Sequence, residues 1–296
     1  MTKAIVNERR PKAVSFRAKT HIGNALFLLP TIALFVFVVL IPFFQGIPYS
    51  FTSWKSIVSS NHPWNGIANY KYLLTNKYFG LSLGVTFHFT FLYLILSNVM
   101  GFALALLIKK ASKFNNFSRT IFFLPFTVSV TAGAIVWSYM FTDVYGTLTG
   151  LVSPLGLPTQ IVPAMSVMAS WRDMGYCMLI YIAGLQTISV DYYEAATVEG
   201  ATKRQQFVHI TIPMIVPAFT TNITLILAWG LRTFDLPMVA SPTMREGQTT
   251  AMYIYQSIFA NNKASLGQAA AIILTVILII LTQVVTRVLR RLEVEA

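Results

Sequence analysis

This chain of 296 residues has few charged side chains: Asp, Glu, Lys and Arg together make up only 11% of it. Soluble domains carry roughly 25% charged residues. Hydrophobic residues account for 55% of the chain. Such a composition cannot supply a polar surface, so a lipid bilayer is the expected solvent. We expect one compact membrane domain.

Cysteine and catalytic motifs are also scarce. The single cysteine, Cys177, lies in an apolar stretch and excludes an intrachain disulfide and a cysteine-based metal site. No Gly-x-x-x-x-Gly-Lys-Ser/Thr phosphate loop occurs, and the chain lacks even a Gly-Lys pair. Neither His-Glu-x-x-His nor Gly-x-Ser-x-Gly is present. The sequence therefore predicts no catalytic residue, no metal site and no cofactor held by this chain, and it disfavours a membrane enzyme.

Long uncharged runs predict an all-α fold with six transmembrane helices. Each run approaches or exceeds the roughly 20 residues that cross a bilayer. Prolines within them, such as Pro30 and Pro125, are tolerable as kinks where neighbouring helices or waters satisfy the freed carbonyls. The predicted spans are Ile22 to Phe44, Leu81 to Ile108, Thr120 to Phe141, Ile161 to Ile188, Met214 to Phe234 and Gly267 to Thr286.

The start of the chain is a basic tail over residues 1–21. It resembles the beginning of a signal peptide. The apolar run that follows is longer than a signal core and shows no clear cleavage site, so we expect a retained first helix. The predicted organisation is this tail, a transmembrane domain over residues 22–286 that includes a cytoplasmic loop over residues 190–213, and a second tail over residues 287–296.

The distribution of Lys and Arg predicts the topology. With the N-terminus inside, the cytoplasmic segments carry 15 of these residues and the opposite side carries five. Basic residues are retained on the cytoplasmic side, so both termini are expected on the cytoplasmic side of the membrane. The net charge of +12 is then mostly a topological signal, and nucleic acid is not an expected partner.

Glu194 to Pro213 is a polar, helix-forming segment in the cytoplasmic connection between the fourth and fifth spans. Asp191 is the expected cap of a first short helix. Gly200 suits the left-handed conformation that ends it, and Thr202 with Gln205 predicts the start of a second helix. We expect residues 190–213 to form a rigid pair of short helices beneath the bilayer that is continuous with the fifth span. This pair is called the foot below. On capping signals alone, a solvated hairpin is the alternative.

The same segment closely resembles the "EAA" signature of permease subunits of bacterial ATP-binding-cassette importers, with Ile212 in place of the usual Leu. The resemblance implies the type I importer permease fold and a coupling helix that docks on a separate ATPase. The residues implied in coupling are Glu194, Ala195, Ala196, Gly200, Ala201, Ile210 and Pro213.

Further stretches are similar to the first permease of sugar or glycerol-phosphate importer pairs. They are "SFTSW", "NGIANYKYLL", "RTIFFLPFTVS", "LIYIAGLQTI" and "RTFDLPMV". The chain departs from that pattern at "ASPTMREG", where such permeases often carry a Thr-x-Gly-Gly-Pro turn. The resemblance implies transport of a sugar, most simply a di- or oligosaccharide. It also implies a second homologous permease, two copies of an ATPase that bind ATP and Mg, and an extracytoplasmic binding protein.

Charge within the spans is the best internal pointer to a substrate path. Arg172 and Asp173 lie near the middle of the fourth span, where each costs roughly 2.5 to 3.5 kcal/mol if it faces lipid. Both should therefore face protein or water. Asn222, Trp229 and Thr233 form a helical stripe on the fifth span, beside Arg232.

By resemblance, the sugar site draws on one aromatic and polar set: Phe126, Trp171, Asp173, Tyr176, Trp229 and Thr233. Aromatic rings offer a flat face to a sugar, and polar groups bind its hydroxyls. The alternative is that Arg172, Asp173, Arg232 and Asp235 only pair within the bundle.

A gradient-driven carrier or channel that acts without an ATPase is the alternative function. The outer aromatic residues Trp54, Trp64, Tyr70 and Tyr72 suit interfacial anchoring or partner docking.

Overall fold

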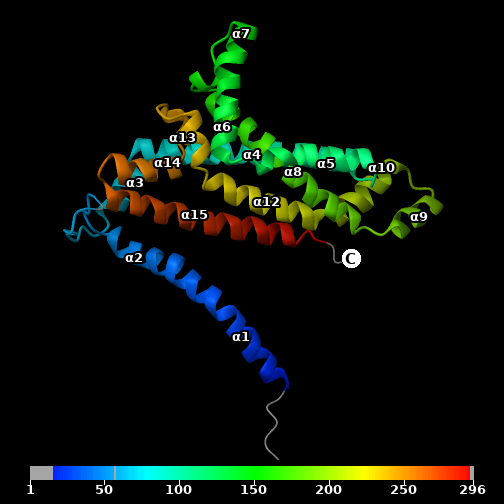
Figure 1. Ribbon diagram of the computed structural model, residues 1–296, viewed down its shortest axis with the longest axis horizontal. Helices are drawn as coiled ribbons and strands as arrows, with labels where there is room; N and C mark the ends of the chain where they lie inside the picture. Colours follow the sequence, from blue (N-terminus) through cyan, green and yellow to red (C-terminus); the bar gives the residue numbers. More distant parts are fainter. Residues whose placement is uncertain (1–15, 57, 294–296) are drawn as a thin grey trace, which may run out of the picture. The chain divides into compact units, whose positions relative to one another are not determined.

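Helices make up most of the computed structural model, which describes residues 16–56 and 58–293 (Figure 1). Within these residues the one extended pairing is an isolated bridge between Thr52 and Trp64. The all-α prediction is therefore confirmed. The chain divides into two units, Met1–Tyr49 and Ser50–Ala296.

The first unit consists of α1 (Phe16–Phe35), a π-helical turn (Val36–Leu40) and α2 (Ile41–Tyr49). Its helix begins before Ile22, where the first span was expected. Residues 1–15 of the predicted basic tail lie outside the described residues. Within this unit, no side chain between residues 24 and 49 is buried. An apolar helix of this kind requires lipid or another protein around it.

The second unit is built on four long helices: α4 (Lys77–Ile108), α8 (Ile161–Gln186), α12 (Val216–Leu231) and α15 (Ala264–Arg290). α8 packs along α4, and α12 lies against both α4 and α15 (Figure 1). Small residues allow this close approach. A Cβ atom at Gly101 of α4 would lie 2.6 Å from the Cβ of Cys177 on α8.

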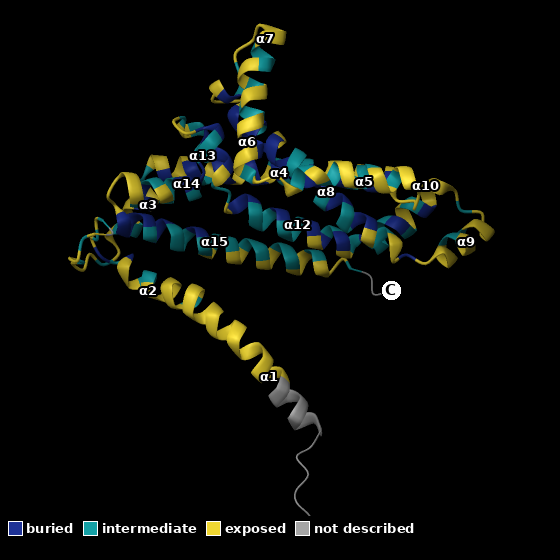
Figure 2. Ribbon diagram, in the orientation of Figure 1, coloured by how far each residue is buried: buried dark blue, intermediate teal, exposed yellow. Residues whose placement is uncertain are grey.

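The core of this unit lies where α4, α8 and α12 meet, and Figure 2 colours many residues of these helices as buried. Tyr181 is fully buried and donates a hydrogen bond to Asn98 Oδ1 at 2.5 Å. Asn222 Nδ2 donates to the carbonyl of Cys177 at 3.2 Å. The Cys177 thiol is free and has no exposed surface. These bonds join helices across the core, where buried polar groups require partners.

The third predicted span, Thr120 to Phe141, is not one helix. α5 (Lys113–Thr127) and α6 (Val130–Tyr139) meet at 96°. Val128 is extended, and Ser129 Oγ accepts a hydrogen bond from the Ala132 amide at 3.2 Å, which caps α6. A capping serine restarts the helix in a new direction. α6 continues through a π turn (Met140–Val144) into α7 (Tyr145–Thr149) and projects from the bundle in Figure 1.

The fifth predicted span is also bent. α10 (Lys203–Gln206), a π turn (Phe207–Thr211) and α11 (Ile212–Met214) meet α12 at 56°. The break falls at Ile215, which is fully buried. The remaining short helices are α3 (Ala68–Thr75), α9 (Val190–Val198), α13 (Asp235–Ala240) and α14 (Thr250–Tyr255), with single 3-10 turns at Pro154–Gly156 and Arg245–Gly247 and a π turn at Gln256–Ala260.

Three helices of the described part are long and apolar enough to cross a membrane, or five if each bent pair forms one span. They are Asn24–Tyr49, α4 and α15, and the bent pairs contain α5 with α6 and α10 with α12. α8 has 26 residues, which is long enough to span a bilayer, but it is not one of these candidate spans and carries both Arg172 and Asp173. A multi-pass helical membrane protein is therefore established, and the count of six spans stays a prediction.

Candidate functional site

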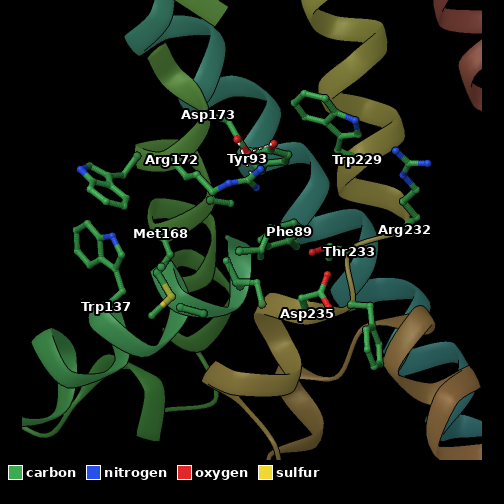
Figure 3. A pocket seen from close by; sticks show the side chains of 17 residues that line it. Phe89, Tyr93, Trp137, Met168, Arg172, Asp173, Trp229, Arg232, Thr233 and Asp235 are labelled. Carbon is green, nitrogen blue, oxygen red and sulfur yellow. Dashed lines mark hydrogen bonds and ion pairs between the residues drawn. The ribbon is translucent and has the colours of Figure 1, made fainter. Parts of the chain in front are cut away.

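A cavity of about 250 Å³ lies inside the second unit. α4, α6, α8, α12 and the segment that leads into α13 supply its walls (Figure 3). Its lining mixes large aromatic rings with two arginines and two aspartates. The aromatic, charged and hydroxyl-bearing side chains at these walls include Phe89, Tyr93, Trp137, Trp171, Arg172, Asp173, Trp229, Arg232, Thr233 and Asp235.

Asp173 is the most enclosed charge at this cavity, with a side chain 2% exposed. Tyr93 on α4 donates its phenolic proton to Asp173 Oδ2 at 2.5 Å. Arg172 Nη1 lies 3.4 Å from Asp173 Oδ1. Both partners compensate the cost of burying a carboxylate. Asp173 is thus engaged with the protein itself.

Part of the Arg172 guanidinium is uncommitted, because its Nε is buried and makes no hydrogen bond within the described part of the chain. Asp173 Oδ1 is likewise buried without a hydrogen bond there. The guanidinium carbon lies 5.4 Å from the ring centroid of Phe126, in a cation–π contact. A buried donor without a partner at a cavity wall suits a ligand acceptor.

Three aromatic rings from three helices form a cluster beside the cavity. Phe126 on α5 stacks on Tyr176 of α8 with centroids 4.7 Å apart. Trp229 on α12 lies 5.4 Å from Tyr176 and 6.1 Å from Phe126. Offset rings at these separations attract one another beyond their buried area. The cluster joins the end of α5, just before its break, to α8 and α12.

The predicted substrate residues come together in the structure, and their role in binding stays a prediction. Trp171, Asp173, Trp229 and Thr233 line the cavity. Phe126 and Tyr176 are not in its lining and belong to the aromatic cluster beside it.

The four charged side chains behave differently from one another. Arg172 and Asp173 form an ion pair, as the alternative interpretation of the sequence expected. Arg232 and Asp235 are exposed and form no ion pair within the described residues. The pairing alternative therefore holds for two of the four residues, and Arg232 and Asp235 remain open to the cavity.

Sequence reasoning missed Tyr93, Phe89 and Trp137, which also line the cavity. Tyr93 and Phe89 lie in an uncharged span, where no residue pattern separates a cavity wall from core. Trp137 follows the unexpected break before α6, and its ring lies 5.7 Å from Trp171. The polar partner that a buried aspartate requires was the one available signal for a residue such as Tyr93.

The predicted foot is present as two short helices around a glycine turn. α9 ends at Val198, and Gly200 adopts the left-handed φ of +81°. Thr202 and Gln205 form a complete capping box at the start of α10. The predicted cap of α9 was wrong: Ser189 Oγ accepts from the Asp191 amide at 3.2 Å, and Asp191 lies in the first helical turn.

The residues that the resemblance implies in coupling are placed along this foot. Glu194, Ala195 and Gly200 are exposed, whereas Ala196, Ala201, Ile210 and Pro213 are half-buried.

The foot was expected to be continuous with the helix of the fifth span. Pro213 instead lies in α11, before the 56° bend, and Pro217 occupies the first turn of α12. Proline at these positions removes backbone donors that a continuous helix would use.

The described residues contain no group of three or more His, Cys, Asp or Glu side chains placed to hold a metal ion.

A bundle of long apolar helices around a cavity with aromatic and charged walls defines a multi-pass membrane protein of the permease type. Residues 97–294 match the family model for the binding-protein-dependent transport system inner membrane component. The chain belongs to this family of transport permeases.

Named relatives resemble the chain over nearly its full length. The probable starch degradation products transport system permease protein AmyD of Thermoanaerobacterium thermosulfurigenes is 32% identical over 286 residues, which cover 94% of this chain and 97% of the relative. The arabinooligosaccharides transport system permease protein AraP of Bacillus subtilis is 27% identical, with 90% and 87% covered.

A solved structure shares the fold. A chain of a bacterial ABC transporter involved in the import of the acidic polysaccharide alginate matches with a TM-score of 0.79 at 24% identity, over 93% of this chain and 99% of that one. The same degree of likeness is found to a bacterial alginate ABC transporter in complex with an alginate pentasaccharide-bound periplasmic protein. The permease fold is thereby confirmed.

Proposed function

We propose that this protein is one of two permease subunits of an ATP-driven importer that carries a di- or oligosaccharide across the bacterial cytoplasmic membrane. The names of AmyD and AraP support a saccharide, since they refer to starch degradation products and arabinooligosaccharides. The cavity supports it independently, because flat rings and directional polar groups are the chemistry that a sugar requires.

The observation that carries this proposal is the wall of the cavity formed by Trp171, Trp229 and Arg172. The rings offer apolar faces, and Arg172 Nε is a buried donor with no hydrogen bond within the described residues. Asp173 Oδ2 accepts from Tyr93, and Asp173 Oδ1 lies beside Arg172 without a hydrogen bond of its own. We therefore assign Arg172 as the polar group that meets substrate, with Asp173, Thr233 and Arg232 as further candidates.

The size of the cavity supports a second permease. Ligand pockets commonly enclose about 300–1,000 Å³, whereas this one has about 250 Å³. An oligosaccharide therefore requires space that a homologous partner supplies. α1 and α2, which bury no described side chain within their own unit, provide apolar surface for that partner and for lipid.

The foot is the proposed contact with one of two copies of a cytoplasmic ATPase, which hold ATP and Mg. Glu194 is exposed on α9, and Val190 and Val198 are 62% and 88% exposed on the same helix. A groove over this helix reaches Lys203 of α10. Exposed apolar side chains around one carboxylate suit a protein partner that offers a basic group. This assignment places residues 190–213 in the cytoplasm with both termini.

An outer groove is the proposed contact with the binding protein. It has a volume of about 570 Å³ and is lined by the segment before α3 and by the turn before α15. The Ala264 amide donates to the Lys55 carbonyl at 3.0 Å, and Asn69 Nδ2 donates to the Thr52 carbonyl at 2.8 Å. The first bond joins the two segments, and the second holds the segment before α3 against α3 itself. Lys55 and Lys263 are the charged residues of the described lining, so an acidic surface of the partner is favoured.

Reconstitution tests the proposed function. The chain is co-expressed with its neighbouring permease, ATPase and binding-protein genes, and labelled maltooligosaccharide uptake is measured in vesicles. We expect uptake that requires ATP and the binding protein and that survives an ionophore. Uptake by vesicles that contain only this chain, abolished by the ionophore, would instead establish a gradient-driven carrier.

A further inference from the structure

Gln206 is an unusual residue for its position. It is 4% exposed, although the foot around it is mostly solvent-accessible and α9 has no buried residue. Within the foot, no core of packed apolar side chains therefore fixes the angle between α9 and α10. Hydrogen bonds must set that angle, because they are directional.

The amide of Gln206 reaches three parts of the foot. Nε2 donates to Thr197 Oγ1 on α9 at 2.8 Å, and it lies 3.4 Å from the Ala201 carbonyl in the turn. It also lies 3.5 Å from the Tyr193 carbonyl. On its own helix, Lys203 Nζ donates to Gln206 Oε1 at 3.3 Å. One side chain thus joins α9, the glycine turn and α10.

A second bond joins α9 to the segment that leads to α12. The Tyr193 hydroxyl and Thr211 Oγ1 are 2.9 Å apart, and Thr211 is 4% exposed. Thr197 Oγ1 donates to the Tyr193 carbonyl at 2.7 Å. The Gln206, Thr197, Tyr193 and Thr211 side chains therefore form a brace between α9 and the segment that leads to α12. Coupled hydrogen bonds of this kind stiffen one another.

We infer that Gln206 is a positioning residue that locks α9 and α10 into one rigid body, so that displacement of α9 is passed to α12. This inference rests on the proposed coupling role of the foot. Gln206 is not part of the proposed ATPase contact, since it is 4% exposed and does not line the groove over α9. Without the brace, the foot still docks, but α9 turns relative to α10 and hydrolysis proceeds with little transport.

The test measures sugar imported per ATP hydrolysed in reconstituted complexes, together with the affinity of the ATPase for the permease pair. Gln206→Met keeps the size of the side chain and removes its hydrogen bonds. We expect a fall of about three- to tenfold in sugar per ATP, with unchanged ATPase affinity. Thr197→Val is expected to lower sugar per ATP alike, and Thr197→Ser to retain it. Thr197 also lines the groove over α9, so the ATPase affinity is compared for Gln206→Met alone. The double variant that combines Gln206→Met with Thr197→Val is expected to be no worse than either single variant.

Gln205→Met is the matched control. Gln205 is the adjacent glutamine, and its Oε1 accepts from the Thr202 amide at 2.7 Å within its own capping box. It is expected to retain sugar per ATP. Wild-type coupling in both Gln206→Met and Thr197→Val would overturn the inference while leaving the proposed function intact. If Gln206→Met fails to assemble, Thr197→Val against Thr197→Ser decides. Absence of ATP-driven uptake in the wild-type complex would instead overturn the proposed function.

Discussion

The Tyr93 hydroxyl donates to Asp173 Oδ2 at 2.5 Å across the interface of α4 and α8. Asp173 Oδ2 thereby has a donor, and Oδ1 lies 3.4 Å from Arg172 Nη1. A tyrosine from one helix and an ion pair from another thus fix the orientation of the arginine at the cavity wall.

Tyr93→Phe is expected to destabilise the protein by about 1–3 kcal/mol, because it leaves a buried carboxylate oxygen without its donor. The thermal midpoint in lipid nanodiscs measures this effect. Tyr139→Phe is the control, since Tyr139 is 61% exposed. Equal midpoints for Tyr93→Phe and the wild type would contradict the role of this bond.

Trp229→Ala is expected to raise the apparent KM for saccharide uptake by about tenfold, because it removes the ring that spans the cavity and the aromatic cluster. Trp229→Phe keeps an aromatic face and should have a smaller effect. Uptake kinetics with the assembled transporter measure both. An unchanged KM in the alanine variant would remove Trp229 from the substrate site.

Gly200→Val is expected to distort the foot, because its φ of +81° costs roughly 1–2 kcal/mol for an ordinary side chain. Space does not limit the substitution, since no atom lies within 4 Å of a Cβ there. Gly200→Asn, which tolerates this conformation, is the control. Sugar imported per ATP should fall in the valine variant and be largely retained in the asparagine variant.

Gly101→Ala is expected to destabilise the bundle by about 1–3 kcal/mol through overpacking, since its Cβ would lie 2.6 Å from that of Cys177. Gly84→Ala on the same helix meets no atom within 4 Å and serves as the control. Thermal midpoints compare the two. A Gly101→Ala protein as stable as Gly84→Ala would show that α4 and α8 separate readily.

Charge reversal at Lys55 and Lys263 is expected to weaken binding of the substrate-binding protein by about tenfold and to reduce the salt dependence of that binding. Lys77→Glu is the control, because Lys77 is exposed at the start of α4 and does not line the outer groove. Binding to nanodisc-embedded transporter is measured at two ionic strengths. Equal losses of affinity in the Lys55, Lys263 and Lys77 variants would indicate long-range electrostatic attraction rather than contact at the outer groove.

Composition and motif spacing predicted the membrane class, the helical fold and the two helices of the foot, because these depend on local sequence. Gly200 and the Thr202–Gln205 capping box lie where the sequence placed them. The break after Thr127 was missed, since an uncharged run does not show where a helix turns. Ser129 was its signal, a capping residue inside apolar sequence.

The site was predictable only in part. Resemblance supplied Trp171, Trp229 and Thr233, which the structure places at one cavity. Tyr93 lies 80 residues from Asp173, and no local pattern connects them. The burial of Gln206 was equally hidden, because a glutamine in a charged helix normally faces water.

The thiol of Cys177 is enclosed between α4 and α8, at the position where Gly101 permits the closest approach. Maleimide reagents reach solvent-accessible thiolates, so the native protein should remain unlabelled by them. Fluorophores or spin labels attached to a cysteine introduced in the foot would then report from that position alone. Movements of the foot during turnover can be followed in a chain whose natural cysteine is left in place.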